Sequence, residues 1–415
     1  MGNKNLMSEL LSPSLLMIVV ASVAAMLLLR PRVFRAPLWR AMVTPFASII
    51  GSGFLVAAPI LAHVAGNFAW LAMLALCGAG YLFGAAIRHN ILHVEPIHAA
   101  NLPISFKALE QFSDLALAFA YFVSVAYYLN LFAAFALRAD DIIDPYLIRW
   151  FSSSVIVLLG LLGAVRGLRA LENLEVVAVG IKLALIAGLL AALSLAGAIA
   201  LSNGPVTLAD INLPAGSKSV GTLLGLLILV QGFETSRYLG AAYDGPTRVK
   251  TMKYAQWLAT GIYIVFILLV TPYFTGNLPA EGGETEIITM LTSLGTVVAP
   301  LIIFAALASQ LSAAVADMSG AGGLLNSVNA RLIPVSVGYL LTATAALAIT
   351  WTASILEIIT YASKAFVLYY GLQSALALME TIRSKQVNCI PKAMLFAVLC
   401  LLSLTVLFFA IPAQI

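Results

Sequence analysis

The stretch PFASIIGSGFLVAAPIL, residues 45–61, is apolar enough for a membrane helix but carries Gly51, Ser52 and Gly53 at its centre. Glycine in a helix interior costs about 1 kcal/mol relative to alanine. Non-helical backbone at membrane depth is tolerated only where it is buried in protein or lines a cavity. We therefore expect a broken membrane helix with a binding site at the break. The alternative is that these glycines only let neighbouring helices approach closely.

The composition indicates an integral membrane protein. The chain has 415 residues, of which 62% are hydrophobic and only 10% are charged, whereas a soluble domain has about a quarter charged residues. No stretch is polar enough for a separate soluble domain. The basic residues lie in short loops between apolar runs, so we expect no nucleic-acid partner. Cys77, Cys389 and Cys400 lack metal-ligand spacing, and we expect free thiols.

About twelve apolar stretches are long enough to cross a bilayer as helices. They cover residues 12–29, 42–65, 68–87, 112–137, 150–167, 178–201, 220–241, 255–275, 294–317, 332–350, 353–378 and 393–411. The excess of lysine and arginine in alternate loops predicts that the loop 30–40 is cytoplasmic and that both termini are outside. We expect an all-α, multi-pass protein of the cell (plasma or inner) membrane.

Ten of these stretches divide into two groups of five that align with each other, so that 42–65 corresponds to 220–241 and 112–137 to 294–317. Five is odd, so the two halves have opposite orientation, which is the pattern of an inverted repeat in secondary transporters. Evenly spaced helices would also give partial matches. The predicted units are 1–40 (an extra N-terminal helix and a basic cytoplasmic loop), 41–201 and 218–382 (the two repeats), and 391–415 (a C-terminal helix).

The alignment also places a second glycine opposite the first break. Gly53 falls on Gly232 in LVQGFETSRYLG, residues 229–240. Paired breaks in corresponding helices point to a substrate site, because the N-terminus of a half-helix can bind a carboxylate and freed carbonyls can bind a cation. We therefore favour a site over close packing as the reason for these glycines.

Three segments resemble the amino acid–polyamine–organocation (APC) permeases. IIGSGFLVAAPIL (49–61) resembles their first core helix, LVQGFETSRYLGAAYDGPTRVKTMKYA (229–255) their sixth helix and the loop after it, and RGLRALENLEVVAVGIKLALIAG (166–188) their fourth-to-fifth helix junction. The resemblance implies a leucine-transporter fold, with a five-plus-five inverted repeat and one extra helix at each end here. It also implies transport of a small amino acid or related amine by alternating access.

The chain departs from the family pattern in three places. It adds a helix before the first core helix, it has RHNILHVEPIHAANLP (88–103) where the family has a glycine-rich loop, and it carries Lys364 in a normally apolar helix. In the family the third core helix lines the substrate site, so the resemblance implies that Tyr127 belongs to the site. The GFE motif implies the same for Glu234. The predicted substrate site is therefore Ile50, Gly51, Ser52, Gly53, Tyr127, Gln231, Gly232, Phe233 and Glu234.

The resemblance also implies proton coupling. Lys182 matches the lysine that takes the place of a sodium ion in proton-coupled members, where an ammonium could neutralise the carbonyls freed at the first break. Alternatively, Lys182 snorkels to the cytoplasmic surface. Ser309 and Ser312 could bond Lys182, an ion or their own backbone. The predicted coupling residues are Lys182, Glu234, Lys364, Ser309 and Ser312.

Partners are predicted for two of the buried charges. Lys364 lies at mid-depth, where a charge is costly without a partner, and Glu234, Asp317 and Glu357 are the anionic candidates. Arg237 follows Glu234 by three residues, so the two side chains could pair on one helix face.

Several function classes have no support in the sequence. There is no GxxxxGK[ST], HExxH or GxSxG motif and no acid–base cluster at one membrane surface, so we expect neither an ATP-driven pump nor an enzyme. His89 and His93 have a spacing that permits a metal, but no cysteine lies near, and we expect no metal and no cofactor. The expected partners are a small amino acid or amine, H+ and the lipid bilayer. A transporter-like sensor, a channel, and sodium-coupled or exchange transport of another small solute remain alternatives.

Overall fold

The computed structural model describes residues 12–34, 36–51, 53–98, 103–205, 208, 216–274, 282–328, 331–384 and 389–413, with only the backbone described at 34, 97, 98, 169–178 and 241. Every regular element in this part of the chain is a helix. The all-α class predicted from the sequence is therefore confirmed.

Nine helical segments among the described residues are long and apolar enough to cross a membrane. Each of them falls on a predicted span. The shortfall against about twelve arises at three places, because the predicted span 12–29 forms a helix of only 16 residues and the spans 42–65 and 220–241 are interrupted. The number twelve and the inverted repeat stay predictions.

The two interrupted spans are the two in which the sequence predicts a break. The first consists of α4 (Pro37–Gly51) and α5 (Phe54–Ala65), and Ser52 between them lies outside the described residues. The second consists of three short pieces, α11 (Ser217–Leu224), η3 (Leu227–Val230) and η4 (Phe233–Ala241), the last two of which are 3-10 helices.

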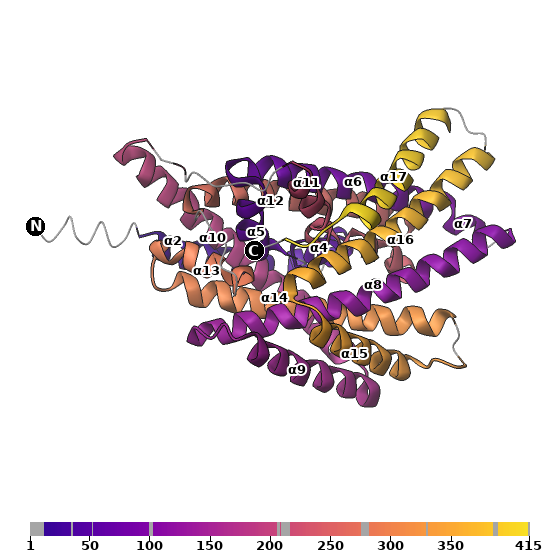
Figure 1. Ribbon diagram of the computed structural model, residues 1–415, viewed down its shortest axis with the longest axis horizontal. Coiled ribbons are helices and arrows are strands. Elements are labelled where there is room, and N and C mark those ends of the chain that lie inside the picture. The colour runs from indigo at the N-terminus through magenta and orange to yellow at the C-terminus, as the bar shows by residue number, and fades with distance from the viewer. Residues whose placement is uncertain are drawn as a thin grey trace, which may run out of the picture.

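Long, continuous helices surround these broken segments. Figure 1 shows α8, α14 and α16 as long helices that run along the length of the molecule, with α9 and α15 side by side below them, and the contacts pair α8 with α14 and α16. The continuous helices are α6 (Ala69–His93), α8 (Ile104–Leu137), α9 (Pro145–Arg166), α10 (Arg169–Asn203), α12 (Gly245–Val270), α14 (Val298–Val328), α15 (Val335–Thr352), α16 (Ile355–Ser384) and α17 (Cys389–Phe409).

Short elements connect the long helices. They are α3 (Pro31–Phe34), η1 (Gly66–Phe68), α7 (Glu95–His98), η2 (Arg138–Asp140), η5 (Thr271–Tyr273), η6 (Gly283–Thr285), α13 (Ile287–Met290) and η7 (Thr292–Leu294).

Local capping explains where two of the long helices begin. Asp144 precedes Pro145, and its carboxylate accepts a hydrogen bond from the Tyr146 amide at 2.8 Å. Asp244 accepts one from the Thr247 amide at 3.1 Å at the start of α12. An acidic N-cap satisfies an otherwise unbonded amide of the first turn. The hydrogen bonds with Thr247 lower the pKa of Asp244.

The extra N-terminal helix α2 (Pro13–Leu28) packs along α10. A Cβ added to Gly188 of α10 would lie 2.5 Å from the Met17 carbonyl oxygen, so glycine is required for this approach. The Ser14 hydroxyl donates to the Leu294 carbonyl at 2.9 Å. Small residues that let helix backbones approach closely are typical of packing within membranes.

The segment that follows α17 turns back over the core. The C-terminus lies near the middle of the molecule in Figure 1. The Ile411 amide donates to the Gly221 carbonyl in α11 at 3.1 Å, and Ala410 and Ala413 are buried. The end of the described chain is therefore bonded to the first piece of the second broken segment.

Candidate functional site

The first break lies between Gly51, the last residue of α4, and Gly53, which precedes α5. Gly53 has φ −178°, an extended conformation open to any residue, so its backbone does not by itself require glycine. A Cβ at Gly53 would, however, lie 2.2 Å from Cδ2 of Leu229 and 3.4 Å from its Cα. The need for glycine at position 53 is therefore explained by its close contact with the second broken segment.

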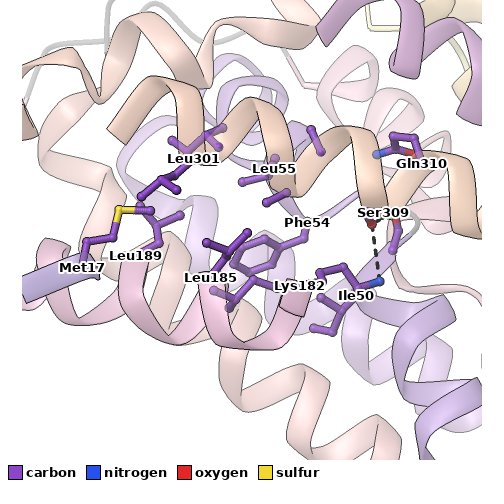
Figure 2. A pocket seen from close by; sticks show the side chains of 15 residues that line it. Met17, Ile50, Phe54, Leu55, Lys182, Leu185, Leu189, Leu301, Ser309 and Gln310 are labelled. Carbon is purple, nitrogen blue, oxygen red and sulfur yellow. Dashed lines mark hydrogen bonds between the residues drawn. The ribbon is translucent and has the colours of Figure 1, made fainter. Parts of the chain in front are cut away.

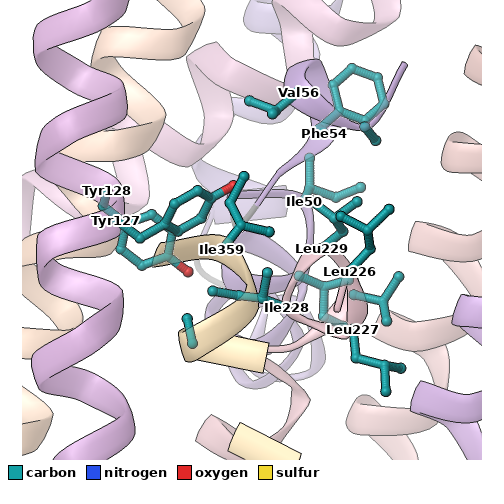
Figure 3. Close-up of a cluster of buried hydrophobic side chains, with 14 of the residues drawn as sticks. Ile50, Phe54, Val56, Tyr127, Tyr128, Leu226, Leu227, Ile228, Leu229 and Ile359 are labelled. Atoms are coloured by element: carbon teal, nitrogen blue, oxygen red, sulfur yellow. The ribbon is translucent and has the colours of Figure 1, made fainter. Parts of the chain in front are cut away.

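The second break is centred on Gly232, whose φ of +117° is one that residues with side chains rarely adopt. A Cβ here would lie 2.4 Å from Oγ of Ser48 and 2.7 Å from the amide nitrogen of Ile49. Each glycine thus touches the other broken segment. The structure brings together the two breaks that the sequence pairs, and Figure 3 shows the buried side chains around them.

Lys182 of α10 lies against the first break. Its Nζ donates to the Ala47 carbonyl of α4 at 2.8 Å and lies 3.4 Å from Oγ of Ser309 on α14, the contact dashed in Figure 2. The Ser309 hydroxyl is in turn 3.5 Å from the Gly51 carbonyl oxygen. Lys182 is buried, so its ammonium is held between α4 and α14 and does not reach the surface. The snorkelling alternative does not fit this position.

Two small cavities adjoin Lys182. One, of about 20 Å³, is lined mostly by apolar side chains of α2, α5, α10 and α14 (Figure 2). The other, also of about 20 Å³, has the hydroxyls of Thr44, Ser48, Thr235 and Ser312 in its wall. A cavity of this size with polar partners can hold a water molecule.

Glu234 completes the backbone bonding of the second break. Its Oε2 accepts from the Gly232 amide and from the Tyr370 hydroxyl, both at 2.9 Å, while the Phe233 ring stacks on Tyr370. The Gln231 amide group donates to the Tyr128 hydroxyl at 2.7 Å. All of these side chains are buried.

Three buried polar atoms of the predicted substrate site have no hydrogen-bond partner among the described residues. They are Oε1 of Glu234, Oε1 of Gln231 and the hydroxyl oxygen of Tyr127. Buried polar atoms are nearly always hydrogen-bonded in native proteins, and each exception calls for an explanation, such as a bound ligand. Tyr127 is also near the first break, 3.3 Å from the Cβ position of Gly53.

Sequence reasoning missed two side chains that bond the broken backbone. The Tyr263 hydroxyl of α12 lies 3.0 Å from the Ile49 carbonyl oxygen and 2.6 Å from that of Leu229, so it bridges the two breaks. Ser363 of α16 donates to the Gly225 carbonyl at 2.7 Å and accepts from the Ile228 amide at 2.9 Å. For both Tyr263 and Ser363, the only signal in the sequence was a polar side chain within an apolar run.

Two predicted pairings differ from the structure. Arg237 does not pair with Glu234, because its guanidinium bonds Glu110 and lies near Glu95. Lys364 is half-exposed and makes no hydrogen bond or ion pair with any described residue. Of its candidate partners, Asp317 accepts from the Ser124 hydroxyl and Glu357 from the Ser354 amide and hydroxyl. A coupling role for Lys364 stays a prediction.

Arg237 instead belongs to a charged cluster beneath η4, on the side that the sequence predicts to be cytoplasmic. It bonds Glu110 of α8, and its Nε lies 3.8 Å from Glu95. Arg248 donates to Glu95 at 2.6 Å and to the Arg237 carbonyl at 2.9 Å. Nearby, His89 lies 2.6 Å from Glu380. These contacts tie the end of the second broken segment to α7, α8 and α12.

The described residues contain no group of three histidine, cysteine or acidic side chains that could hold a metal ion. His98, which lies in the segment 88–103 that departs from the family pattern, is described by its backbone only.

Comparison with known proteins identifies the family. A family model described as an APC superfamily transporter matches residues 31–410. The chain belongs to the APC superfamily of transporters. An uncharacterized protein of Aquifex aeolicus (strain VF5) is 41% identical over 361 residues, which cover 86% of this APC chain and 88% of the relative.

A solved structure supports the fold of this APC transporter. It is a Na+-coupled sialic acid symporter in a substrate-bound, outward-open state, which aligns with a TM-score of 0.51 over 96% of this chain and 97% of the symporter. The sequence identity is 12%, so the likeness concerns the fold alone. The predicted leucine-transporter fold is confirmed at this level, and the chain is a multi-pass membrane transporter of a small solute.

Proposed function

We propose that this APC transporter is a proton-coupled carrier that moves a small amino acid or related amine across the cell (plasma or inner) membrane. Transport would occur by alternating access about the two breaks. The observation that carries the proposal is the contact of the buried Lys182 ammonium with the Ala47 carbonyl beside the first break.

This contact offers a physical route from protonation to conformation. Lys182 belongs to α10 and its acceptor to α4, so the hydrogen bond joins two separate helices. A protonated amine attracts the carbonyl dipoles at the end of α4, whereas a neutral amine attracts them much less. Protonation therefore favours the arrangement in which α4 packs against α10, and deprotonation releases it. A ligand shifts a conformational equilibrium only through such a difference between the two states.

The hydroxyl-lined cavity next to Lys182 supports the same proposal. It borders α4, η4, α10 and α14, and a single water there would be within a polar wall. A proton acceptor such as this water could therefore lie next to the ammonium. A proton could then leave Lys182 without crossing the apolar cavity on its other side.

The substrate class follows from the unpartnered atoms at the second break. Oε1 of Glu234 and Oε1 of Gln231 are acceptors, and an ammonium group offers three donors. An unsatisfied buried polar group costs about 1–3 kcal/mol, so a ligand that donates to these atoms gains affinity. An anion without an amine would instead face the Glu234 carboxylate. We therefore favour an amine-bearing substrate bound between the breaks by Gly51, Gly53, Tyr127, Gln231 and Glu234, with Ile50, Ser52, Gly232 and Phe233 around it.

The test is uptake of labelled amino acids and putrescine into proteoliposomes with an inward proton gradient, an inward sodium gradient, or neither. Wild type is compared with Lys182→Ala, Lys364→Ala and the matched control Lys250→Ala, an exposed lysine on α12. We expect uptake that requires the proton gradient, is lost in Lys182→Ala and is unchanged in Lys250→Ala. A loss of proton-driven uptake in Lys364→Ala would add Lys364, on α16, to the coupling residues.

Two other outcomes would overturn parts of the proposal. Sodium-driven uptake that is indifferent to Lys182→Ala would keep the transporter and refute proton coupling, in line with the Na+ coupling of the structural neighbour. If no compound of the panel is taken up by wild-type protein, the proposed substrate class is wrong.

A further inference from the structure

The extra N-terminal helix α2 packs against both α10 and α14. Ala21 of α2, Leu185 of α10 and Ala305 of α14 form one cluster of buried apolar side chains. The other face of α2 is exposed, and Val19 and Met26 there are 50% and 63% exposed. In a membrane protein, an exposed apolar helix face lies against lipid. The helix α2 therefore separates the space between α10 and α14 from the lipid.

The apolar cavity next to Lys182 extends along this contact. Met17, which is only 1% exposed, and Leu189 line the cavity together with Lys182. Figure 2 shows Met17 beside Leu189 and Lys182 beside Ser309. Leu189 follows Lys182 by seven residues, which is about 10 Å along α10. Met17 and Lys182 therefore lie at opposite ends of the cavity.

The two cavities beside Lys182 lie on opposite sides of it along α14. The apolar cavity is lined by α14 residues between Leu301 and Gln310, and the hydroxyl-lined cavity by residues between Ser312 and Ala316. The predicted orientation of the chain places the Leu301 end toward the outside and the Ala316 end toward the cytoplasm. Lys182 thus has a polar cavity on its cytoplasmic side and an apolar cavity on its external side.

The external end of the apolar cavity is close to the start of α2. Met17 follows Pro13, the first residue of α2, by four residues, which is about 6 Å along the helix axis. Water that entered at Met17 would reach Lys182 from the outside, while the hydroxyl-lined cavity approaches Lys182 from the other side. A carrier can use a proton gradient only if its proton-binding group is not open to both sides at once. A closure at Met17 would meet this requirement.

We propose that α2 is an insulating helix and that Met17 closes the external end of the apolar cavity, so that the Lys182 amine exchanges protons through the hydroxyl-lined cavity alone. The thioether side chain suits this role because methionine is unbranched and fills irregular apolar space. The inference rests on the proposed function, because it gives the extra helix a part in proton coupling.

The first measurement is proton flux in the absence of substrate. Proteoliposomes loaded with the pH indicator pyranine receive an inside-negative potassium diffusion potential, and the rate of internal acidification is recorded. Met17→Ser enlarges the cavity by more than the roughly 30 Å³ that one water molecule occupies in the liquid, and it adds a hydroxyl that can bond this water. We expect a flux about tenfold above that of wild type, equivalent to a barrier lower by about 1.4 kcal/mol.

Three variants test the specificity of this leak. Met26→Ser is the matched control, because the same substitution then falls on the exposed face of the same helix. Met17→Leu keeps an apolar side chain of similar size. We expect both variants to have the proton flux of wild type. Met17→Ser combined with Lys182→Ala should also lose the leak, since the leaking proton passes through the amine.

The second measurement does not depend on the coupling ion. Methyl isothiocyanate is small, uncharged and soluble in lipid, and a neutral amine adds to its central carbon to form a thiourea. Its reaction with Lys182 is followed by mass spectrometry of the digested protein. We expect Lys182 to react about tenfold faster in Met17→Ser than in wild type or Met26→Ser, equivalent to a barrier lower by about 1.4 kcal/mol. The exposed Lys250 should react equally in all three proteins.

Three results would overturn the inference. They are a proton flux in Met17→Ser equal to that of wild type, a leak that persists when Lys182 is also replaced, and a rate of Lys182 modification that does not change in Met17→Ser. Size-exclusion chromatography verifies that each variant is folded. If Met17→Ser is not monodisperse, Met17→Ala takes its place, because it also shortens the side chain.

The outcome is separable from that of the uptake experiment. Proton-driven uptake by wild type, together with unchanged modification of Lys182 in Met17→Ser, would refute the closure by Met17 alone. Sodium-driven uptake, together with faster modification of Lys182 in Met17→Ser, would refute proton coupling and retain Met17 as the closure of the cavity.

Discussion

The two breaks are stabilised in different ways. Apart from the Tyr263 hydroxyl that both breaks share, the first break is bonded by a charge, the Lys182 ammonium on the Ala47 carbonyl, and by a long contact of 3.5 Å from Ser309 to Gly51. The second is bonded by short contacts of the neutral Ser363 hydroxyl, which lies 2.7 Å from the Gly225 carbonyl oxygen and 2.9 Å from the Ile228 amide nitrogen. A contact that depends on a cation can be removed by a proton transfer, whereas a neutral hydrogen bond cannot. The comparison suggests that the first break is adjustable and that the second is fixed.

The largest expected effect is at Gly232. Gly232→Ala adds a Cβ 2.4 Å from Oγ of Ser48 at a φ of +117°, and we expect a loss of about 3 kcal/mol or more from strain and overpacking. Gly53→Ala meets the movable end of the Leu229 side chain and should cost less, about 1–3 kcal/mol. Thermal unfolding in detergent measures both.

The control for these variants is Gly261→Ala, because no atom lies within 4 Å of the Cβ position of Gly261 in α12. It should be neutral or slightly stabilising. If Gly53→Ala were the more destabilising of the two, the second break would not be the more rigid one.

Next in size is Ser363→Ala. The substitution leaves the Gly225 carbonyl and the Ile228 amide without the serine hydroxyl, at a cost of about 2 kcal/mol for buried backbone groups. Ser374→Ala on the same helix is the control, because its hydroxyl bonds only the Tyr370 carbonyl of its own helix. Equal melting temperatures for the two variants would show that Ser363 does not stabilise the second break.

Tyr263→Phe affects both breaks at once, and we expect it to cost about 1 kcal/mol. The hydroxyl it removes is shared between the carbonyls of Ile49 and Leu229. If this bridge keeps the breaks in register, the variant will also slow uptake at saturating substrate. A variant with lowered stability but unchanged uptake would limit Tyr263 to a structural role.

The smallest effect on stability is expected for Ser309→Ala, well below 1 kcal/mol, because its contacts are 3.4 and 3.5 Å long. Its effect on coupling should be larger than its effect on stability. We expect the dependence of uptake on external pH to shift relative to wild type, since Ser309 lies next to Lys182. A pH profile identical to that of wild type would remove Ser309 from the coupling residues.

Glycine in apolar runs was enough to predict where the chain breaks, and a charge in an apolar run drew attention to Lys182, which lies against the first break. Gly51, Gly53 and Gly232 are costly in continuous membrane helices, so their presence is informative without a structure. The hydroxyls of Tyr263 and Ser363 could not be assigned in this way. In a helix buried on most sides, the sequence pattern does not say which face meets a break.

The sequence also did not predict which side chains pair when they are far apart along the chain. Arg237 bonds Glu110 and approaches Glu95, residues far from it in sequence, whereas the sequence suggested its neighbour Glu234. The glycines that mark the site also divide the predicted spans 42–65 and 220–241 into shorter helices.

The contact of Ser14 with Leu294 has a consequence for the timing of synthesis. The two residues are 280 positions apart, so at about 5–20 residues per second the acceptor follows the donor by roughly 15–60 s. During that interval α2 has no Leu294 to bond and must remain stable among lipids. Its nearly uniform apolar surface, PSLLMIVVASVAAMLL, is suited to that period, and close packing against Gly188 follows only when α10 has been inserted.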